Sequence, residues 1–270
     1  MILKNIILGK YYNTDSFVHS LDPRTKFLSL IMVLLAVTMV SNLYFLGGLL
    51  LFLFFTILLS NISIGYFLRQ LIPFLWIILI TFFLHIIFTN GRILLQIPGV
   101  NFRLTYEGIY NGIFYDFRII LLLAFSSLFM LTTSPVDITD GMEVLFKPLK
   151  KLKIPVDKFA LIVSISLRFI PTIFEEAERI KKAQIARGAE IEKGIVKRIQ
   201  NVTSIIIPVF VSVFRRADEL AVALQARGYP PKCERTYYRS INFKISDFYA
   251  LIFVFLLTST LLFFNKYIFG

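Results

Sequence analysis

The sequence predicts an all-α membrane protein with about five transmembrane helices and a cytoplasmic domain of three helices, two of them long and crossing. Of its 270 residues, 57% are hydrophobic, whereas soluble domains usually contain about 45–50%. The charges are unevenly spread, because 20 of the 29 Lys and Arg and 12 of the 17 acidic residues lie between Ser134 and Lys244. Positive residues accumulate on the cytoplasmic side of membranes, so this segment is expected to be cytoplasmic.

Apolar stretches define the expected spans, since a membrane helix needs about 20 mostly apolar residues. Two helices are expected in residues 27–60, with a turn near Ser41-Asn42 or Gly47-Gly48, and single helices at 66–89, 109–133 and 248–268, with a loop at 90–106. The basic residues before residue 27 place the N-terminus inside. The expected organisation is a cytoplasmic N-terminal segment at 1–26, transmembrane helices 1–4 at 27–134, a cytoplasmic domain at 135–245 and a C-terminal transmembrane helix at 246–270.

Three helical patterns occupy the charged segment. The first, Val136 to Lys151, is basic and amphipathic, which is typical of a helix at the membrane surface. The second runs from about Asp157, a plausible N-cap, to Arg187, and the third from about Lys193 to Arg227. Each long pattern has an apolar middle and a charged end. Pro171 and Pro208 are expected to bend or break them near their centres.

The tripeptides Ala186-Arg187-Gly188 and Ala226-Arg227-Gly228 end the two long patterns, forty residues apart. A single copy would be read as a helix end, with Gly in the left-handed conformation and Arg in the last turn. The residues upstream also match, since Phe174, Ala177 and Ala183 align with Phe214, Ala217 and Ala223. Generic caps do not require such matching, so each arginine is predicted to dock into a carboxylate-bearing socket on a partner.

Two other segments have both a structural and a functional interpretation. Arg168, in Ser-Leu-Arg-Phe-Ile-Pro, is either an interfacial snorkelling residue or part of a buried pair that fixes the crossing of the long helices. Asp22 and Arg24, in Leu-Asp-Pro-Arg-Thr-Lys, read first as an N-cap followed by Pro and a basic interface anchor. The same segment is also a candidate tie between the N-terminus and the internal helices.

Several classes of function are disfavoured. The sequence has no G-x-x-x-x-G-K-[ST] motif for ATP and no catalytic or metal motif, so neither a cofactor nor a metal is expected. The net charge of +12 sits in a mixed-charge segment and does not indicate nucleic acid. Charged residues are nearly absent from the expected spans, which argues against a self-sufficient carrier or channel. That class and a lipid-modifying membrane enzyme remain the alternatives to a coupling subunit.

Taken in order, these segments resemble the transmembrane (T) component of energy-coupling factor (ECF) transporters, the EcfT/CbiQ-like family. The resemblance covers essentially the whole chain and rests on Leu-Asp-Pro-Arg-Thr-Lys, Ser-Leu-Arg-Phe-Ile-Pro and the two Ala-Arg-Gly ends. It implies a non-catalytic subunit in the plasma membrane of a prokaryote. Its implied partners are two ABC-type ATPase subunits and a separate membrane subunit that binds the substrate, a vitamin or a metal ion.

The resemblance also implies roles for individual residues. Docking to the ATPase subunits would fall to Ala186, Arg187, Gly188, Ala226, Arg227 and Gly228. The platform for the substrate-binding subunit would consist of Phe169, Ile173, Phe174, Val209, Phe210 and Val213. A structural part in coupling would fall to Arg168, Pro171, Pro208, Asp22 and Arg24.

Overall fold

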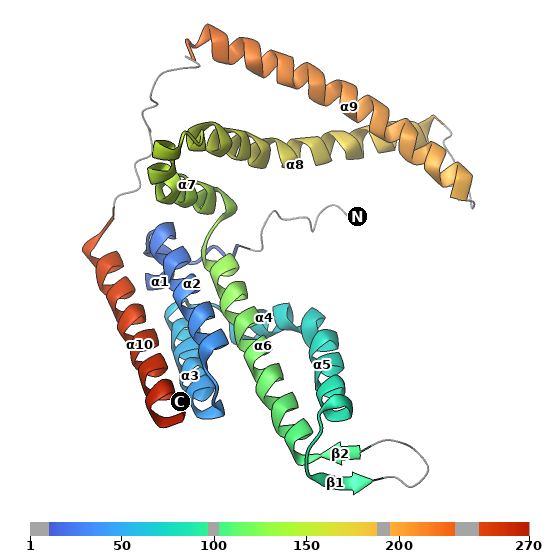
Figure 1. Ribbon diagram of the computed structural model, residues 1–270. Helices are drawn as coiled ribbons and strands as arrows, with labels where there is room; N and C mark the ends of the chain where they lie inside the picture. The colour runs from blue at the N-terminus through green and yellow to red at the C-terminus, as the bar shows by residue number, and fades with distance from the viewer. Residues whose placement is uncertain (1–10, 97–102, 188–194, 230–242, 270) are drawn as a thin grey trace. The chain divides into compact units, whose positions relative to one another are not determined.

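The computed structural model describes residues 11–96, 103–187, 195–229 and 243–269, without the side chains of 95–96, 103–104, 195–201 and 268–269. Its elements in chain order (Figure 1) are α1 Phe17–Ser20, α2 Pro23–Met39, α3 Leu43–Leu59, α4 Ile64–Leu71, the 3-10 turn η2 Ile72–Phe74, α5 Leu75–Phe88, β1 Ile93–Gln96, β2 Arg103–Thr105, α6 Tyr106–Thr132, α7 Pro135–Phe146, the 3-10 turn η3 Lys147–Leu152, α8 Val156–Ala186, α9 Ile195–Ala226 and α10 Ile245–Phe269. The expected all-α class is confirmed.

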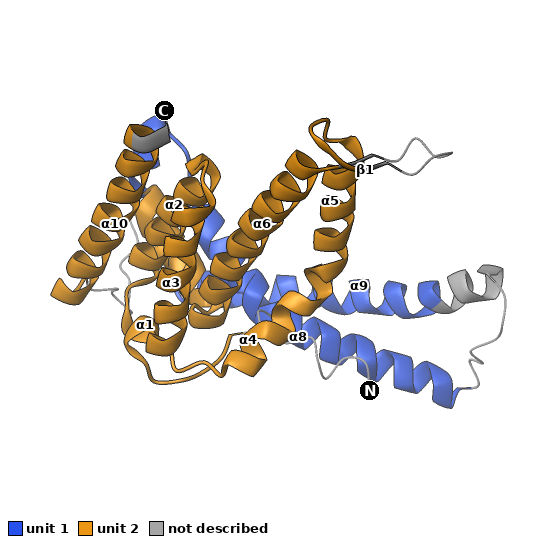
Figure 2. Cartoon of the chain, turned by 90° about the horizontal axis from the view of Figure 1, so that it is seen from below, with its two compact units in different colours: residues 1–8, 147–240 blue, residues 9–146, 241–270 orange. Residues whose placement is uncertain are grey.

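The chain divides into two compact units, each described here by itself (Figure 2). The bundle unit comprises residues 9–146 and 241–270, and the long-helix unit comprises residues 1–8 and 147–240. Helix α7 belongs to the bundle unit because it packs against α2. This grouping differs from the predicted start of a separate domain at residue 135. The grouping into units reflects how the helices pack, whereas the predicted boundary separates membrane-spanning residues from residues expected on the cytoplasmic side.

The core of the bundle unit forms where α2 packs against α6 and α10, and α3 against α6. Fully buried apolar side chains from successive turns of these helices fill it, among them Val37, Leu46, Leu49, Leu121 and Leu131. The chain turns between α2 and α3 at Val40–Asn42, close to the first of the two predicted sites. Gly47 and Gly48 lie inside α3.

Within the described ranges, three helical segments are long and apolar enough to cross a membrane: Ile64–Phe88, Tyr106–Thr132 and Ile245–Tyr267. The first is not one regular helix, since α4 and α5 are joined through the 3-10 turn that contains Pro73, where proline removes a backbone donor. Helices α2 and α3 have 17 residues each, which is about 26 Å at 1.5 Å per residue and near the lower limit for a span. The described helices are those of a multi-pass membrane protein, and the count of five spans stays a prediction.

Helices α5 and α6 form a close pair whose approach depends on two glycines. A Cβ on Gly108 would lie 3.1 Å from the backbone oxygen of His85, and a Cβ on Gly112 would lie 2.9 Å from the Phe82 ring. Small residues four apart permit such close packing of membrane helices. The connection between α5 and α6 differs from the expected loop, because β1 and β2 form an antiparallel pair within it.

A buried polar junction holds the N-terminal ends of α2 and α10 together. Asp22 is the N-cap of α2, with Pro23 at the first helical position, and its Oδ1 accepts a hydrogen bond from the Arg24 N–H at 2.8 Å. The Asp22 N–H in turn donates to Oδ1 of Asp247 at 2.8 Å, and Oδ2 of Asp247 accepts from the Lys244 N–H, also at 2.8 Å. Asp22 and Asp247 are 5% and 1% exposed, so these bonds replace water for groups that cannot reach it.

A second set of bonds fastens the segment before α2 to the end of α6. The Lys26 ammonium donates to the carbonyl oxygens of His19 and Thr132, each at 3.0 Å. The His19 Nε2–H donates to the Tyr12 carbonyl at 2.9 Å, which leaves Nδ1 to accept from the Ser16 hydroxyl at 2.6 Å. Burial, and then the charge of Lys26, lower the pKa of His19. The neutral imidazole required by these bonds is therefore the favoured form.

The junction predicts a specific loss of stability. Asp247→Ala removes the acceptor of the buried Asp22 N–H, and an unsatisfied buried donor costs about 1–3 kcal/mol. The thermal midpoint of the purified chain in detergent should fall clearly. Asp247→Asn should lower the thermal midpoint less, because the amide oxygen of Asn still accepts one hydrogen bond. The exposed Asp218 provides the control variant Asp218→Ala, and equal midpoints for it and Asp247→Ala would contradict the assignment.

Candidate functional site

The long-helix unit is built on α8, which begins at Val156 after Pro155. Asp157 is therefore not the N-cap, as the sequence suggested. It lies in the first turn, where a carboxylate favours the helix dipole, and its Oδ2 pairs with Lys150 Nζ at 2.5 Å. With 31 residues, α8 is about 46 Å long at 1.5 Å per residue. It is therefore long enough to carry an apolar middle and a separate charged end.

Neither proline ends its helix. Pro171 lies inside α8 and Pro208 inside α9, and both helices run without interruption to Ala186 and Ala226. Proline in a helix interior removes one backbone hydrogen bond and crowds the preceding turn. Of the two expected outcomes, a bend or a break, the break is wrong because the remaining turns keep each helix continuous, and the bend stays a prediction.

Helices α8 and α9 pack against each other and run in opposite directions (Figure 1). The ion pair between them joins Arg216 Nη2 to Glu176 Oε2 at 3.5 Å, and Arg179 Nη1 lies 3.8 Å from the same oxygen. The side chain of Glu176 is 19% exposed and that of Arg216 is 37% exposed, so the pair is partly shielded from water. It links the two long helices forty residues apart in sequence.

Sequence reasoning missed this link. Acidic and basic side chains one turn apart on α8 also suit pairing within the helix, as Glu178 shows, whose Oε1 lies 3.1 Å from Lys182 Nζ. That hydrogen bond lowers the pKa of Glu178. Arg168, the residue proposed for a pair that fixes the crossing, lies exposed on α8. Arg168 is therefore not part of a buried pair in the chain by itself, its snorkelling interpretation stays a prediction, and the ion pair at the crossing is made by Arg216.

Arg187 and Arg227, the two arginine tips, lie at the C-terminal ends of the long helices. Arg187 is the C-cap of α8, and its N–H donates to the Ala183 carbonyl at 3.1 Å. Ala186, Arg187, Ala226 and Arg227 are all exposed. Because α8 and α9 are antiparallel, the tips lie at opposite ends of the pair (Figure 1). The structure does not bring them together into one site.

Gly228 ends α9 in the manner that the sequence suggested. Its φ is +70°, which favours glycine. Its N–H donates to the Gln225 carbonyl at 2.9 Å, and the Tyr229 N–H donates to the Leu224 carbonyl at 3.0 Å. These two bonds form a Schellman motif, which turns the chain away at once and leaves Arg227 at the tip. Gly188, its counterpart in the first copy, lies outside the described residues.

The six predicted platform residues fall into two groups. Four of them are half-buried. Ile173 lies three residues before Glu176, and Val213 lies three residues before Arg216. Phe169 and Val209 lie one turn earlier in the same helices. Residues three and seven apart share a helix face, so these four lie on the sides where α8 and α9 meet. Phe174 and Phe210 are exposed and remain available to a partner.

The apolar surface of α9 extends beyond Phe210. In the middle of this helix, between residues 206 and 214, four other large side chains are at least 47% exposed: Ile206, Ile207, Val211 and Phe214. Contiguous exposed apolar surface of this kind marks a site of protein or membrane contact. The long-helix unit therefore combines charged tips with an uncovered apolar middle.

The few charged residues of the expected spans include two in α6. Asp116 of α6 is buried and its Oδ1 accepts from the Thr81 hydroxyl at 2.6 Å. Arg118 donates to the Val40 carbonyl at the end of α2, and its guanidinium lies 4.7 Å from the centre of the Phe114 ring. Both were visible as a D-x-R triplet inside an apolar run. Their partners make them local structural groups within α2, α5 and α6.

Comparison with known proteins agrees with this architecture. The family model described as cobalt transport protein (CbiQ) matches residues 14–238. A relative in Bacillus subtilis, named energy-coupling factor transporter transmembrane protein EcfT, is 42% identical over 97% of this chain and 99% of its own length. Relatives of the same name in Brevibacillus brevis and Lactococcus lactis are 43% and 38% identical, over 91% and 98% of this chain and 93% and 99% of their own lengths.

These matches extend through both units, including α8, α9 and their tips. With a family model over most of the chain and relatives near 40% identity over nearly all of it, the chain belongs to the EcfT/CbiQ family, the transmembrane components of energy-coupling factor transporters.

Proposed function

We propose that this chain is the non-catalytic coupling subunit of an ECF-type importer, which passes ATP-driven motion from two ATPase subunits to a separate substrate-binding membrane subunit. The observation that carries the proposal is the pair of exposed arginines at opposite ends of two crossed, antiparallel helices. Two separate tips suit two separate partners of the same kind. The substrate class is a vitamin or a metal ion, bound by the other membrane subunit.

Each tip suits insertion into an acidic groove. The guanidinium groups of Arg187 and Arg227 are exposed beyond the last turn of their helices, and the planar fork of arginine pairs with carboxylates through two hydrogen bonds. ATP binding would draw the two ATPase subunits together and so change the separation of the tips. This places the tips, the long-helix unit and the N-terminus on the cytoplasmic side of the plasma membrane.

The Glu176–Arg216 pair would act as the pivot of this movement. Among the described residues it is the ion pair that joins α8 to α9. Along each helix it lies between the arginine tip and an exposed phenylalanine, which is Phe174 on α8 and Phe210 on α9. A change of angle at the pivot would move those apolar surfaces against the substrate-binding subunit. The chain would thus convert a change in tip separation into a tilt of its partner.

Asp116 and Arg118 are the charged groups that a self-sufficient carrier would need within its membrane helices. Asp116 accepts from Thr81 and Arg118 donates to a helix-end carbonyl, so both already have structural partners. Family membership and these bonds together favour the coupling subunit.

Charge reversal tests the docking role of the tips. Arg187→Glu and Arg227→Glu should each lower recovery of the ATPase subunits with the purified complex by at least tenfold, because truncating a buried interfacial charge costs about 2–5 kcal/mol. Lys158→Glu, an equally drastic change on the exposed start of α8, is the control. Full recovery of ATPase subunits and full uptake with both arginines reversed would refute the docking role.

Charge exchange tests the pivot separately. Glu176→Arg and Arg216→Glu should each reduce uptake while ATPase subunits still co-purify, and the double exchange should restore part of the uptake. A partly exposed pair contributes only about 0.2–1 kcal/mol, so the thermal midpoint should change little. If the double variant is as impaired as the worse single variant, the pair is not the pivot.

A further inference from the structure

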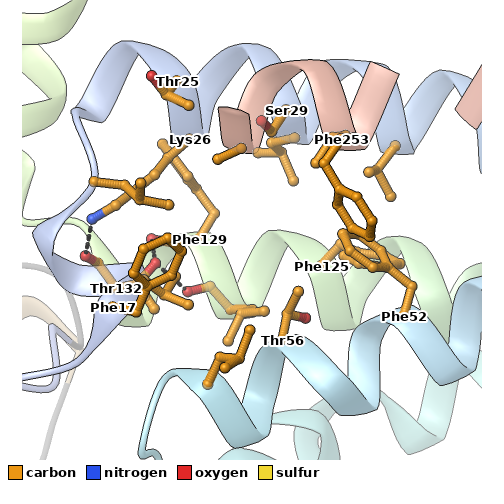
Figure 3. A pocket seen from close by; sticks show the side chains of 18 of the residues that line it. Phe17, Thr25, Lys26, Ser29, Phe52, Thr56, Phe125, Phe129, Thr132 and Phe253 are labelled. Carbon is orange, nitrogen blue, oxygen red and sulfur yellow. Dashed lines mark hydrogen bonds between the residues drawn. The ribbon is translucent and has the colours of Figure 1, made fainter. Parts of the chain in front are cut away.

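The bundle unit contains a pocket of about 540 Å³. It lies between α3 and α10, with α2 and α6 behind it and α1 at one end, as the side chains of Thr56, Phe253, Ser29, Phe129 and Phe17 show (Figure 3). Apolar pockets of about 300–1,000 Å³ with a few placed polar groups are the usual form of small-molecule sites. Nothing in the proposed coupling role uses this one.

Aromatic rings close one end of the pocket. The ring centre of Phe52 in α3 lies 6.0 Å from that of Phe125 in α6 and 6.2 Å from that of Phe253 in α10. Beyond them, a Cβ on Gly48 would lie 3.7 Å from Leu261. Helices α3 and α10 therefore meet at this end and diverge toward α1, which gives the pocket an elongated, tapering form.

The other end is polar and holds the Lys26 ammonium. Lys26 Nζ donates to the carbonyls of His19 and Thr132, and an ammonium has three donors. Among the described residues these two carbonyls are its hydrogen-bond acceptors, so one donor remains for a ligand oxygen. Asp22, Asp137 and Asp247 act electrostatically on Lys26, which makes a neutral oxygen a better fit here than another full negative charge.

The rim of the pocket is continuous with the surface that faces lipid. Phe17, Phe55, Tyr249 and Phe253 line the pocket and are each more than half exposed. In a multi-pass membrane protein such side chains contact acyl chains, so the bilayer supplies an apolar, elongated ligand at the mouth. An apolar pocket left empty loses dispersion contacts along its whole lining.

We propose that this pocket binds one acyl chain of a membrane phospholipid, with an ester oxygen of the lipid accepting a hydrogen bond from Lys26 Nζ. The chain runs from Lys26 past Phe129 toward the Phe52–Phe125–Phe253 rings. The lipid wedges α3 and α10 apart and becomes part of the packing of the bundle unit. Headgroup charge has little influence, because the ester oxygen and the tail make the contacts. This inference does not depend on the proposed function.

The test uses the full chain reconstituted in vesicles of phosphatidylethanolamine and phosphatidylglycerol, extracted in mild detergent and examined by native mass spectrometry. The wild type should retain one phospholipid per chain, of either headgroup in the proportion of the vesicles. Thr56→Phe fills the pocket with a ring and should lower retention at least tenfold. Thr260→Phe, on the exposed face of α10, is the matched control and should retain the lipid.

Lys26→Met is the second variant and should lower retention about tenfold, since a hydrogen bond to a charged group is lost. The thermal midpoints of all variants separate loss of lipid from loss of fold. Equal retention in Thr56→Phe and Thr260→Phe would overturn the proposal, as would retention of phosphatidylglycerol alone or of detergent alone.

Discussion

A buried charge or backbone group must find a partner inside the protein, because hydrocarbon and packed apolar side chains cannot solvate it, and this constraint accounts for the polar contacts at three helix ends of the bundle unit. Asp247 accepts a hydrogen bond from the backbone N–H of Asp22 at the start of α2. Lys26 donates to the carbonyl of Thr132 at the end of α6, and Arg118 donates to the carbonyl of Val40 at the end of α2. Each charged group thus satisfies a helix end that lacks its own partner. The same bonds fix how the helices pack.

The long-helix unit follows from the release of that constraint. In the cytoplasmic location proposed for this unit, charged side chains carry no such cost, which fits the exposed arginines at the ends of α8 and α9 and the partly shielded Glu176–Arg216 contact between them. Their apolar middles stay uncovered in the chain alone, as Phe210 and Phe214 show. A subunit with charged tips and an uncovered apolar surface is incomplete without partners, in agreement with membership of a multi-subunit transporter family.

Features set by local sequence could be predicted, and features set by register between distant segments could not. The apolar helices, the turn after α2 and the Gly228 cap follow from hydropathy and backbone preference, and α8 and α9 end within one residue of expectation. The Glu176–Arg216 pair depends on how two helices cross, so Glu176 looked like a partner for its own helix. Asp157 was misread because Pro155 takes the cap position, and the β1–β2 pair joins segments of 4 and 3 residues, too short to give a strand pattern.

In the proposed mechanism, the separation of the two arginine tips follows the nucleotide state of the partners. This dependence is tested most directly by spin labels at the equivalent positions Ala183 and Ala223, with Cys233 replaced by Ser, in the assembled transporter. The distance distribution between the labels should shift between the nucleotide-free and ATP-bound complexes. An unchanged distribution in a complex that hydrolyses ATP and imports its substrate would contradict the account.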